Sequence, residues 1–484
     1  MKRSPTIFIL FFLSGISTLV YEIVWTRMLT LVFGHTVFSV SIVLAAFMAG
    51  LGFGSYLWGH TIDKTSNPLL VYAKIEIGIA FLCAILTPVL AGFAPFYTWF
   101  HAWIPDNPIL LDFIKCVLAF LIILLPASLM GATLPIISKY YVTDASDLGS
   151  KIGLLYAINT LGAAMGCVFT GYVFISFLGV MQTAFLAVAI NLFVGIGAIR
   201  ILQDSALEPE TKTNWTLPIP ARSKNKWSKQ DKLWLATSFV CGFTALAYEI
   251  LWTRLLVFSI ASTVYSFSMM LAVFLLGIAL GSLLVTLVLK FCSEMRAILI
   301  VLQAGLSIYI VTSLFGVDQI LSAPWNSYNL EDPWMAFLKY FKDSATLMLI
   351  PTMFLGMCFP ILTRMVAKTP SRIGGGTGVI YFFNALGGIL GSLVAGFFLL
   401  PLIGSQKSFM FLAAINLLCA GYLFLTSNFL TSQLRKALGV ISLSLMIALF
   451  FSIPEGLLDP FFMRDSAGKR NIKKLLYFNE GLTE

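Results

Sequence analysis

The sequence contains few charged residues. Asp, Glu, Lys and Arg together make up 11% of its 484 residues, whereas about 25% is usual in soluble domains. A chain with so few polar side chains cannot cover a folded surface in water, which excludes an ordinary soluble protein. Hydrophobic residues make up 59% of the chain and gather in runs of about 18 residues or more, long enough to cross a hydrocarbon layer about 30 Å thick. The composition therefore predicts an all-α polytopic membrane protein embedded in a lipid bilayer.

The sequence also lacks the residue groupings that carry catalysis or bind metals. It has three histidines and seven cysteines, and no two cysteines form a Cys-x-x-Cys pair. No Ser/His/Asp set and no paired catalytic carboxylates stand out. We therefore predict no catalytic residues, no metal site and no cofactor in this chain. Its net charge of +9 does not call for a nucleic-acid partner, because the placement of the basic residues between the apolar runs accounts for it.

The second half of the chain repeats the first. Tyr-Glu-Ile-Val-Trp-Thr-Arg at 21–27 recurs as Tyr-Glu-Ile-Leu-Trp-Thr-Arg at 248–254, an offset of 227 residues. Further along the offset becomes 225, and the shared residues there include Pro126 with Pro351, Gly131 with Gly356 and Asn159 with Asn384. Self-similarity over such a length predicts two copies of one multi-helix unit.

The apolar runs predict six helices in each copy. They cover 6–33, 37–59, 70–93, 112–138, 152–176 and 179–201, then 233–258, 262–289, 296–316, 342–366, 377–401 and 406–427. One more run, 437–453, brings the total to about 13 spans. An even number of spans in each copy predicts two parallel six-helix repeats, an arrangement similar to the major facilitator superfamily, with one extra C-terminal helix.

This pattern divides the chain into five segments. We predict a first transmembrane repeat over 1–201, a basic cytoplasmic linker over 202–232, a second repeat over 233–430, an extra helix over 431–454 and a tail over 455–484. With the N-terminus inside, about twenty Lys and Arg residues fall on the inner side of the repeats and about four on the outer side. Basic residues collect on the cytoplasmic side of membrane proteins, so we predict a cytoplasmic N-terminus.

The repeated motif places ionisable residues within apolar helices. Glu22 and Arg27 lie in the first copy, and Glu249 and Arg254 in the second. A charge at such a depth is costly unless it is paired or hydrated, which marks these four residues as a candidate charge or substrate site. In one interpretation Glu22 pairs with Arg254 and Glu249 pairs with Arg27, which locks the two halves together. In the other, the acids form a cation or proton site that faces a central cavity.

Four polar residues complete the candidate site. Tyr21 and Tyr248 precede the two acids, and Asn159 and Asn384 stand about one turn before Gly-xxx-Gly patterns. Such patterns let helix backbones approach closely in lipid. For the two asparagines, hydrogen bonding across these helix contacts is the structural interpretation, and a role in transport is the functional one.

Two loop segments also attract attention. Gly59 to Lys64, which includes Asp63, resembles a shortened form of a loop motif of major-facilitator proteins. Arg372 to Gly378 is rich in glycine and superficially similar to a nucleotide-binding loop. A dinucleotide loop requires a preceding strand and an acidic residue about 20 positions later, and neither is present, so we predict no nucleotide binding there.

The doubled motif, together with Leu-Met-Gly-Ala-Thr-Leu-Pro at 129–135 and Tyr-Ala-Ile-Asn-Thr-Leu-Gly-Ala at 156–163, resembles the membrane portion of fused major-facilitator/spermidine-synthase-like proteins of bacteria. The resemblance implies a multi-pass protein of the bacterial cytoplasmic membrane, followed by a polyamine aminopropyltransferase-like domain. The end of the chain, 473–484, is similar to the lead-in to that domain. The catalytic residues of such a transferase would lie beyond residue 484 or in a separate chain.

The resemblance leaves three functions open. The chain is either a transporter-like unit for polyamines or related small cations, a membrane anchor or scaffold for a catalytic partner, or a secondary transporter of an unrelated solute. Whether the protein takes part in an enzymatic reaction depends on the transferase-like domain that the resemblance implies.

Overall fold

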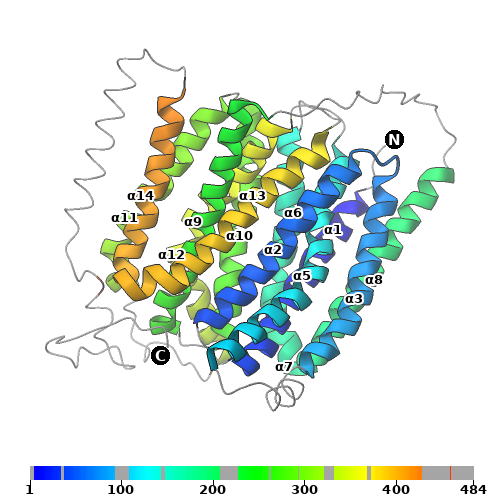
Figure 1. Ribbon diagram of the computed structural model, residues 1–484, viewed down its shortest axis with the longest axis horizontal. Coiled ribbons are helices and arrows are strands. Elements are labelled where there is room, and N and C mark those ends of the chain that lie inside the picture. Colours follow the sequence, from blue (N-terminus) through cyan, green and yellow to red (C-terminus); the bar gives the residue numbers. More distant parts are fainter. Residues whose placement is uncertain are drawn as a thin grey trace.

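The computed structural model describes residues 5–33, 37–92, 108–142, 148–207, 227–260, 263–292, 294–320, 332–367, 372–427 and residue 458. The regular elements in these ranges are helices. They form two sets, which lie side by side in Figure 1, the blue and cyan helices next to the green, yellow and orange ones.

The first helix set contains six long helices. They are α1 (Thr6–Phe33), α2 (Val37–Ile62), α3 (Pro68–Ala91), α5 (Pro108–Tyr141), α6 (Leu148–Phe169) and α8 (Val180–Leu207). A π-helical turn, η1 (Thr170–Phe174), and the short helix α7 (Ile175–Leu178) continue the course of α6.

The second helix set also contains six long helices. They are α9 (Lys229–Ile260), α10 (Val264–Phe291), α11 (Met295–Ile320), α12 (Pro333–Val366), α13 (Ile373–Val394) and α14 (Leu400–Leu425). A π-helical turn, η4 (Ala395–Leu399), connects α13 to α14.

Polar caps fix where several of these apolar helices begin. The Asn67 side chain accepts a hydrogen bond from the backbone N–H of Leu70 at the start of α3. Thr263 and Ser266 form a reciprocal capping box at the start of α10. Asp332 accepts from the N–H of Trp334 at the start of α12. Each cap satisfies a backbone donor that the first turn of a helix leaves without a partner.

Equivalent helices pack in the same pairs in both sets. In the first set α1 packs against α6, α2 against α5 and α3 against α8. In the second set α9 packs against α13, α10 against α12 and α11 against α14. The sets meet where α2 lies along α13 and α6 lies along α10. The helices that carry the repeated motif, α1 and α9, thus hold equivalent positions in the two sets.

Glycines allow the closest of these helix contacts. A Cβ atom on Gly54 would overlap the carbonyl oxygen of Ser128, and one on Gly281 would overlap that of Met353. Gly162 approaches the Phe12 carbonyl in the same way. The prediction that the Gly-xxx-Gly patterns serve helix packing is therefore confirmed.

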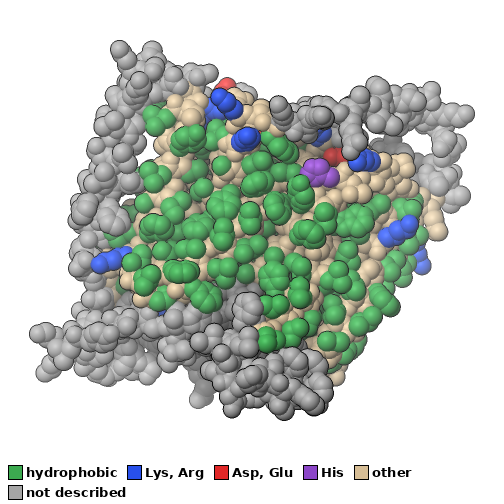
Figure 2. Space-filling view, in the orientation of Figure 1, with side chains coloured by type: hydrophobic (Ala, Val, Ile, Leu, Met, Phe, Trp, Pro, Cys, Tyr) green, Lys and Arg blue, Asp and Glu red, His purple; other side chains and the backbone are tan. Residues whose placement is uncertain are grey.

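The outer surface is apolar over the long helices. Figure 2 shows hydrophobic side chains across most of the visible face, with Lys and Arg mainly near its edges. Ten helical segments of the described residues are long and apolar enough to cross a membrane. The expected all-α, multi-pass membrane architecture is therefore confirmed, while the count of 13 spans and the division into two six-helix repeats stay predictions. The extra helix over 431–454, most of the linker over 202–232 and the tail, apart from Leu458, lie outside the described residues.

Candidate functional site

The repeated motif directs consecutive side chains to different neighbours. On α1 the ring of Tyr21 stacks on Trp25, with 5.3 Å between their centroids, and Tyr21 contacts the Cys83 thiol of α3. On α9 Tyr248 stacks on Trp252 in the same way at 5.4 Å. Because adjacent helix residues point about 100° apart, each following glutamate faces away from the aromatic pair.

Glu22 and Glu249 both face the boundary between the helix sets. Their exposed fractions are 7% and 8%. The two carboxyl groups interact electrostatically with each other, and both interact with the buried Cys167 thiol of α6. The motif thus brings one acid from each helix set into a common, largely buried environment.

Aromatic side chains lie at the same boundary. Tyr381 of α13 interacts electrostatically with Glu22 and with Tyr156 of α6. The ring of Phe359 of α12 lies 4.7 Å from Tyr156 and 5.8 Å from Tyr381, measured between centroids. Tyr156 and Tyr381 stand 225 residues apart, so they are equivalent positions of the sequence repeat. The acids are therefore accompanied by a pair of equivalent tyrosines.

The predicted acid–base pairs across the two halves are not formed. In the described part of the structure no ion pair joins Glu22 to Arg254 or Glu249 to Arg27. Arg27 and Arg254 are half-buried, and neither is without a partner. The physical reason lies in the helix geometry, because residues five apart point about 140° apart, so each arginine leaves the boundary that its glutamate faces.

The two asparagines join helices within each set. Asn159 Nδ2 donates to the Phe11 carbonyl oxygen at 3.0 Å, which ties α6 to α1. Asn384 Nδ2 donates to the Ser238 carbonyl oxygen at 3.2 Å, which ties α13 to α9. The expected hydrogen bonds across the glycine contacts are confirmed, and a role of these residues in transport stays a prediction.

Tyr21 and Tyr248 differ in their hydroxyl contacts. The Tyr248 hydroxyl accepts a hydrogen bond from Asn416 Nδ2 at 3.0 Å. The Tyr21 hydroxyl is buried beside the Cys83 thiol, a weak hydrogen-bonding group, and makes no hydrogen bond to an oxygen or nitrogen atom among the described residues. Neither tyrosine reaches the boundary at which Glu22 and Glu249 meet, since both face the interior of their own helix set.

A third buried acid, Glu76 of α3, was not predicted from the sequence and is fully buried. Its carboxyl accepts from Ser14 Oγ at 2.6 Å and from Asn191 Nδ2 at 2.7 Å. A lone acid in an apolar run is itself a signal of function. The repeat offset of 227 could have supported that signal, because it pairs Glu76 with Gln303.

An ion pair on α12 was not predicted either. Lys339 Nζ lies 2.7 Å from Asp343 Oδ2, and both side chains are buried. The four-residue spacing places both residues on one helix face. In the first repeat the equivalent residues, 225 positions earlier, are Ile114 and Leu118, so this pair is specific to the second helix set.

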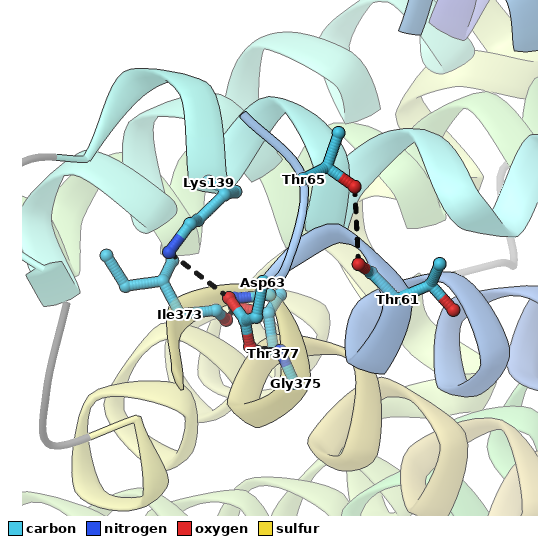
Figure 3. A network of polar contacts seen from close by, with 8 residues as sticks. Thr61, Asp63, Thr65, Lys139, Ile373, Gly375 and Thr377 are labelled. Atoms are coloured by element: carbon cyan, nitrogen blue, oxygen red, sulfur yellow. Dashed lines mark hydrogen bonds and ion pairs between the residues drawn. The ribbon is translucent and has the colours of Figure 1, made fainter. Parts of the chain in front are cut away.

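The loop after α2 joins the two helix sets (Figure 3). Asp63 Oδ1 accepts from the Gly374 N–H at 3.0 Å, and Asp63 Oδ2 accepts from the Gly375 N–H at 2.8 Å. Lys139 Nζ of α5 lies 3.4 Å from Asp63 Oδ1. The glycine-rich segment that resembles a nucleotide loop is thus the start of α13, and its free N–H groups bind an acid of the other helix set.

Burial and these contacts act on Asp63 in opposite directions. Burial raises the pKa of its carboxyl above the ordinary value, while the Gly375 N–H, the Lys139 ammonium group and the Gly374 N–H lower it. The net result is a raised pKa. The position of Asp63 between α2, α5 and α13 makes it a structural tie at one end of the boundary.

The chemistry of the boundary suits a cation. Two buried carboxyl groups that repel each other are stabilised by a positive charge between them, and tyrosine rings attract cations through their π faces. Among the described residues no group of three or more His, Cys, Asp or Glu could hold a metal ion.

Residues 7–392 match the sequence model of the Major Facilitator Superfamily. The match covers most of the chain, so this protein belongs to that superfamily. No curated protein is similar in sequence to the chain. Membership confirms the major-facilitator part of the expected resemblance, and the spermidine-synthase-like part stays a prediction.

Several solved structures have a similar fold. A human organic anion transporter is 13% identical, with a TM-score of 0.53 over 86% of this chain and 97% of its own. A bacterial homologue of the iron transporter ferroportin is 12% identical, with a TM-score of 0.53 over 90% and 99%. The fucose:proton symporter of E. coli is 14% identical, with a TM-score of 0.52 over 86% and 97%. At such identities the likeness extends to the fold alone.

Proposed function

We propose that this protein is a secondary transporter of small organic cations, with Glu22 and Glu249 as the carboxyl groups that bind them. The observation that carries the proposal is the meeting of two largely buried acids, one from each helix set, with no ion pair to a base among the described residues. Intramembrane acids in such positions commonly mark substrate or ion pathways.

The arrangement favours a substrate with more than one positive charge. Each carboxyl can accept from one ammonium group, and the equivalent tyrosines Tyr156 and Tyr381 offer further cation–π contacts. A polyamine, which carries ammonium groups along a flexible chain, fits these requirements. A site shared by both helix sets also suits transport in which the two halves rock around a fixed binding position.

We also propose that the chain forms two parallel six-helix repeats and a thirteenth span over 431–454, with a cytoplasmic N-terminus, in a bacterial inner membrane. A spermidine-synthase-like domain or chain would be its partner. The alternatives are a non-transporting anchor or scaffold for such a partner, and a secondary transporter of an unrelated solute. The scaffold predicts neither binding nor uptake of the cation, and the unrelated transporter predicts uptake of another solute.

The experiment is uptake and binding of radiolabelled spermidine by the full chain in proteoliposomes. Glu22→Gln and Glu249→Gln are each expected to weaken binding by about 30-fold or more, since loss of a buried charge partner costs about 2 kcal/mol or more. Glu294→Gln, which changes an exposed acid before α11, is the matched control and should bind like the wild type. Absence of both binding and uptake in the wild type would contradict the proposal.

A further inference from the structure

A second polar centre lies inside the first helix set, away from the boundary. Glu76 of α3 accepts from Ser14 Oγ of α1 at 2.6 Å and from Asn191 Nδ2 of α8 at 2.7 Å. All three side chains are buried, with exposed fractions of 0%, 2% and 1% for Glu76, Ser14 and Asn191. Three helices therefore contribute to one small polar site in an otherwise apolar bundle.

No base neutralises this acid. Among the described residues no ion pair involves Glu76. The titratable groups that face it are the hydroxyls of Tyr72, on its own helix, and Tyr21, on α1. Neither α5 nor α8 brings a charged side chain to it within the described residues. An isolated carboxylate in so apolar a place is costly, and such a group avoids that cost by taking up a proton.

One buried oxygen atom next to the acid lacks a donor. Asn191 Oδ1 makes no hydrogen bond among the described residues. The Tyr72 hydroxyl lies beside the Glu76 carboxyl and interacts with it both electrostatically and as a hydrogen-bonding group. A proton on Glu76 would give the carboxyl a donor for Asn191 Oδ1 after the amide turns over. The site can therefore hold the protonated carboxyl as well as the ionised one.

The second helix set shows that packing does not require an acid here. The equivalent of Glu76 is Gln303, and the equivalent of Ser14 is Cys241. Gln303 Nε2 donates to Cys241 Sγ at 3.2 Å, so an amide fills the same place in the fold. The first repeat therefore has an acid where the second has a neutral amide of similar shape. Packing alone does not require the acid.

We propose that Glu76, with Ser14, Tyr72 and Asn191, forms an exchangeable proton-binding site inside the first helix set. The donors Ser14 and Asn191 stabilise the ionised carboxyl, while burial and the absence of a base stabilise the protonated one. A group supported in both forms can exchange its proton. The site is separate from Glu22 and Glu249, so it does not depend on the proposed substrate.

Helix α1 connects this site to the boundary between the helix sets. The same helix carries Ser14, which bonds to Glu76, and Glu22, which faces the boundary. Tyr21, next to Glu22, interacts electrostatically with Glu76, and its hydroxyl lies beside the weakly hydrogen-bonding Cys83 thiol. A change in the charge of Glu76 therefore acts on the helix that holds one of the two boundary acids.

Infrared difference spectroscopy on the full chain in lipid bilayers tests the proposal. The wild type is expected to show a protonated-carboxyl band that disappears reversibly as the pH is raised. Glu76→Gln, which copies the amide of Gln303, should lose this band, and Glu22→Gln should retain it. Ser14→Cys, which copies Cys241, leaves the acid in place and should shift the band because it weakens a hydrogen bond to the carboxyl.

Three results would overturn the proposal. A band that survives across the alkaline range in which the protein stays folded would make Glu76 a permanently protonated structural group. A band that Glu76→Gln retains and Ser14→Cys does not shift would place the proton elsewhere. Loss of the band on addition of NaCl at constant pH would identify the ligand as a metal cation. Should Glu76→Gln fail to fold, the shift in Ser14→Cys decides the assignment.

Discussion

Tyr21 and Glu22 are neighbours in the sequence, but their side chains lie in two different environments. The tyrosine packs inside the first helix set against Trp25 and Cys83, while the glutamate meets Glu249 across the boundary. The rotation of about 100° between adjacent helix residues accounts for the division. One short motif can therefore anchor a helix and present an acid at the same time, which explains why the tyrosine and the glutamate recur together.

The two tyrosines of the motif offer a matched test at this scale. Tyr248→Phe should lower the free energy of unfolding by about 1 to 2 kcal/mol, because it leaves the buried Asn416 amide without its partner. Tyr21→Phe should cost clearly less, because among the described residues its hydroxyl contacts only the weakly hydrogen-bonding Cys83 thiol. Thermal or denaturant unfolding of both purified variants provides the measurement. Equal losses in the two variants would show that the hydroxyl contacts do not set the difference.

At the scale of the helices, the two sets share the positions of their helix irregularities. The π-helical turns η1 and η4 begin at Thr170 and Ala395, and the positive φ angles occur at Gly179 and Gly404. Both pairs are 225 residues apart. At Gly404 the backbone has φ 72° and ψ 171°, a region essentially restricted to glycine. The break in each helix is therefore a property of the repeated unit.

Variants of two glycines in α14 distinguish the effect of backbone strain from the effect of replacing a glycine as such. Gly404→Ala should lower the free energy of unfolding by about 1 to 3 kcal/mol, because alanine is strained at that φ and ψ. Gly421→Ala, at a position with no atom within 4 Å of the added Cβ, should be neutral or stabilise α14 by up to about 1 kcal/mol. Unfolding curves of the two variants provide the comparison. A loss at Gly421 as large as that at Gly404 would contradict the explanation by strain.

For the whole molecule, the sequence repeat predicted much of the arrangement. The predicted span 6–33 coincides with α1 (Thr6–Phe33), and the other predicted spans within the described residues each correspond to a helix. Apolar runs define such helices because lipid requires every backbone group to bond within the helix. The repeat also related Glu22 to Glu249, two residues that the structure brings to one boundary.

Other features depend on three-dimensional contacts that a linear pattern does not contain. The pairs of Glu22 with Arg254 and Glu249 with Arg27, which one interpretation expected, are not seen among the described residues, because each arginine points away from the boundary that its glutamate faces. The two backbone N–H groups that bind Asp63 lie more than 300 positions away in the chain. Glu76 was overlooked because its partners come from α1 and α8, at separations of 62 and 115 residues.

Asp63 provides a test of how the two helix sets are held together. Its pKa is raised by burial, so the folded protein binds this proton more tightly than the unfolded chain does. The stability that depends on this group is therefore present below about pH 4, the ordinary value for aspartate, and is lost as the pH rises through the raised pKa. Relative to Asp63→Asn, which cannot titrate there, the wild type should become less stable over that window.

The unfolding temperatures of both proteins, measured across that pH range, show how the stability difference between them changes with pH. Thr61→Ala, an exposed change two residues earlier that keeps the carboxyl, is the control and should follow the wild type. A wild type that gains stability over Asp63→Asn with rising pH would mean that the Gly374 and Gly375 N–H groups and Lys139 outweigh burial. Asp63 would then hold α2 to α13 mainly as a charged group, and acid would separate the two helix sets at that end.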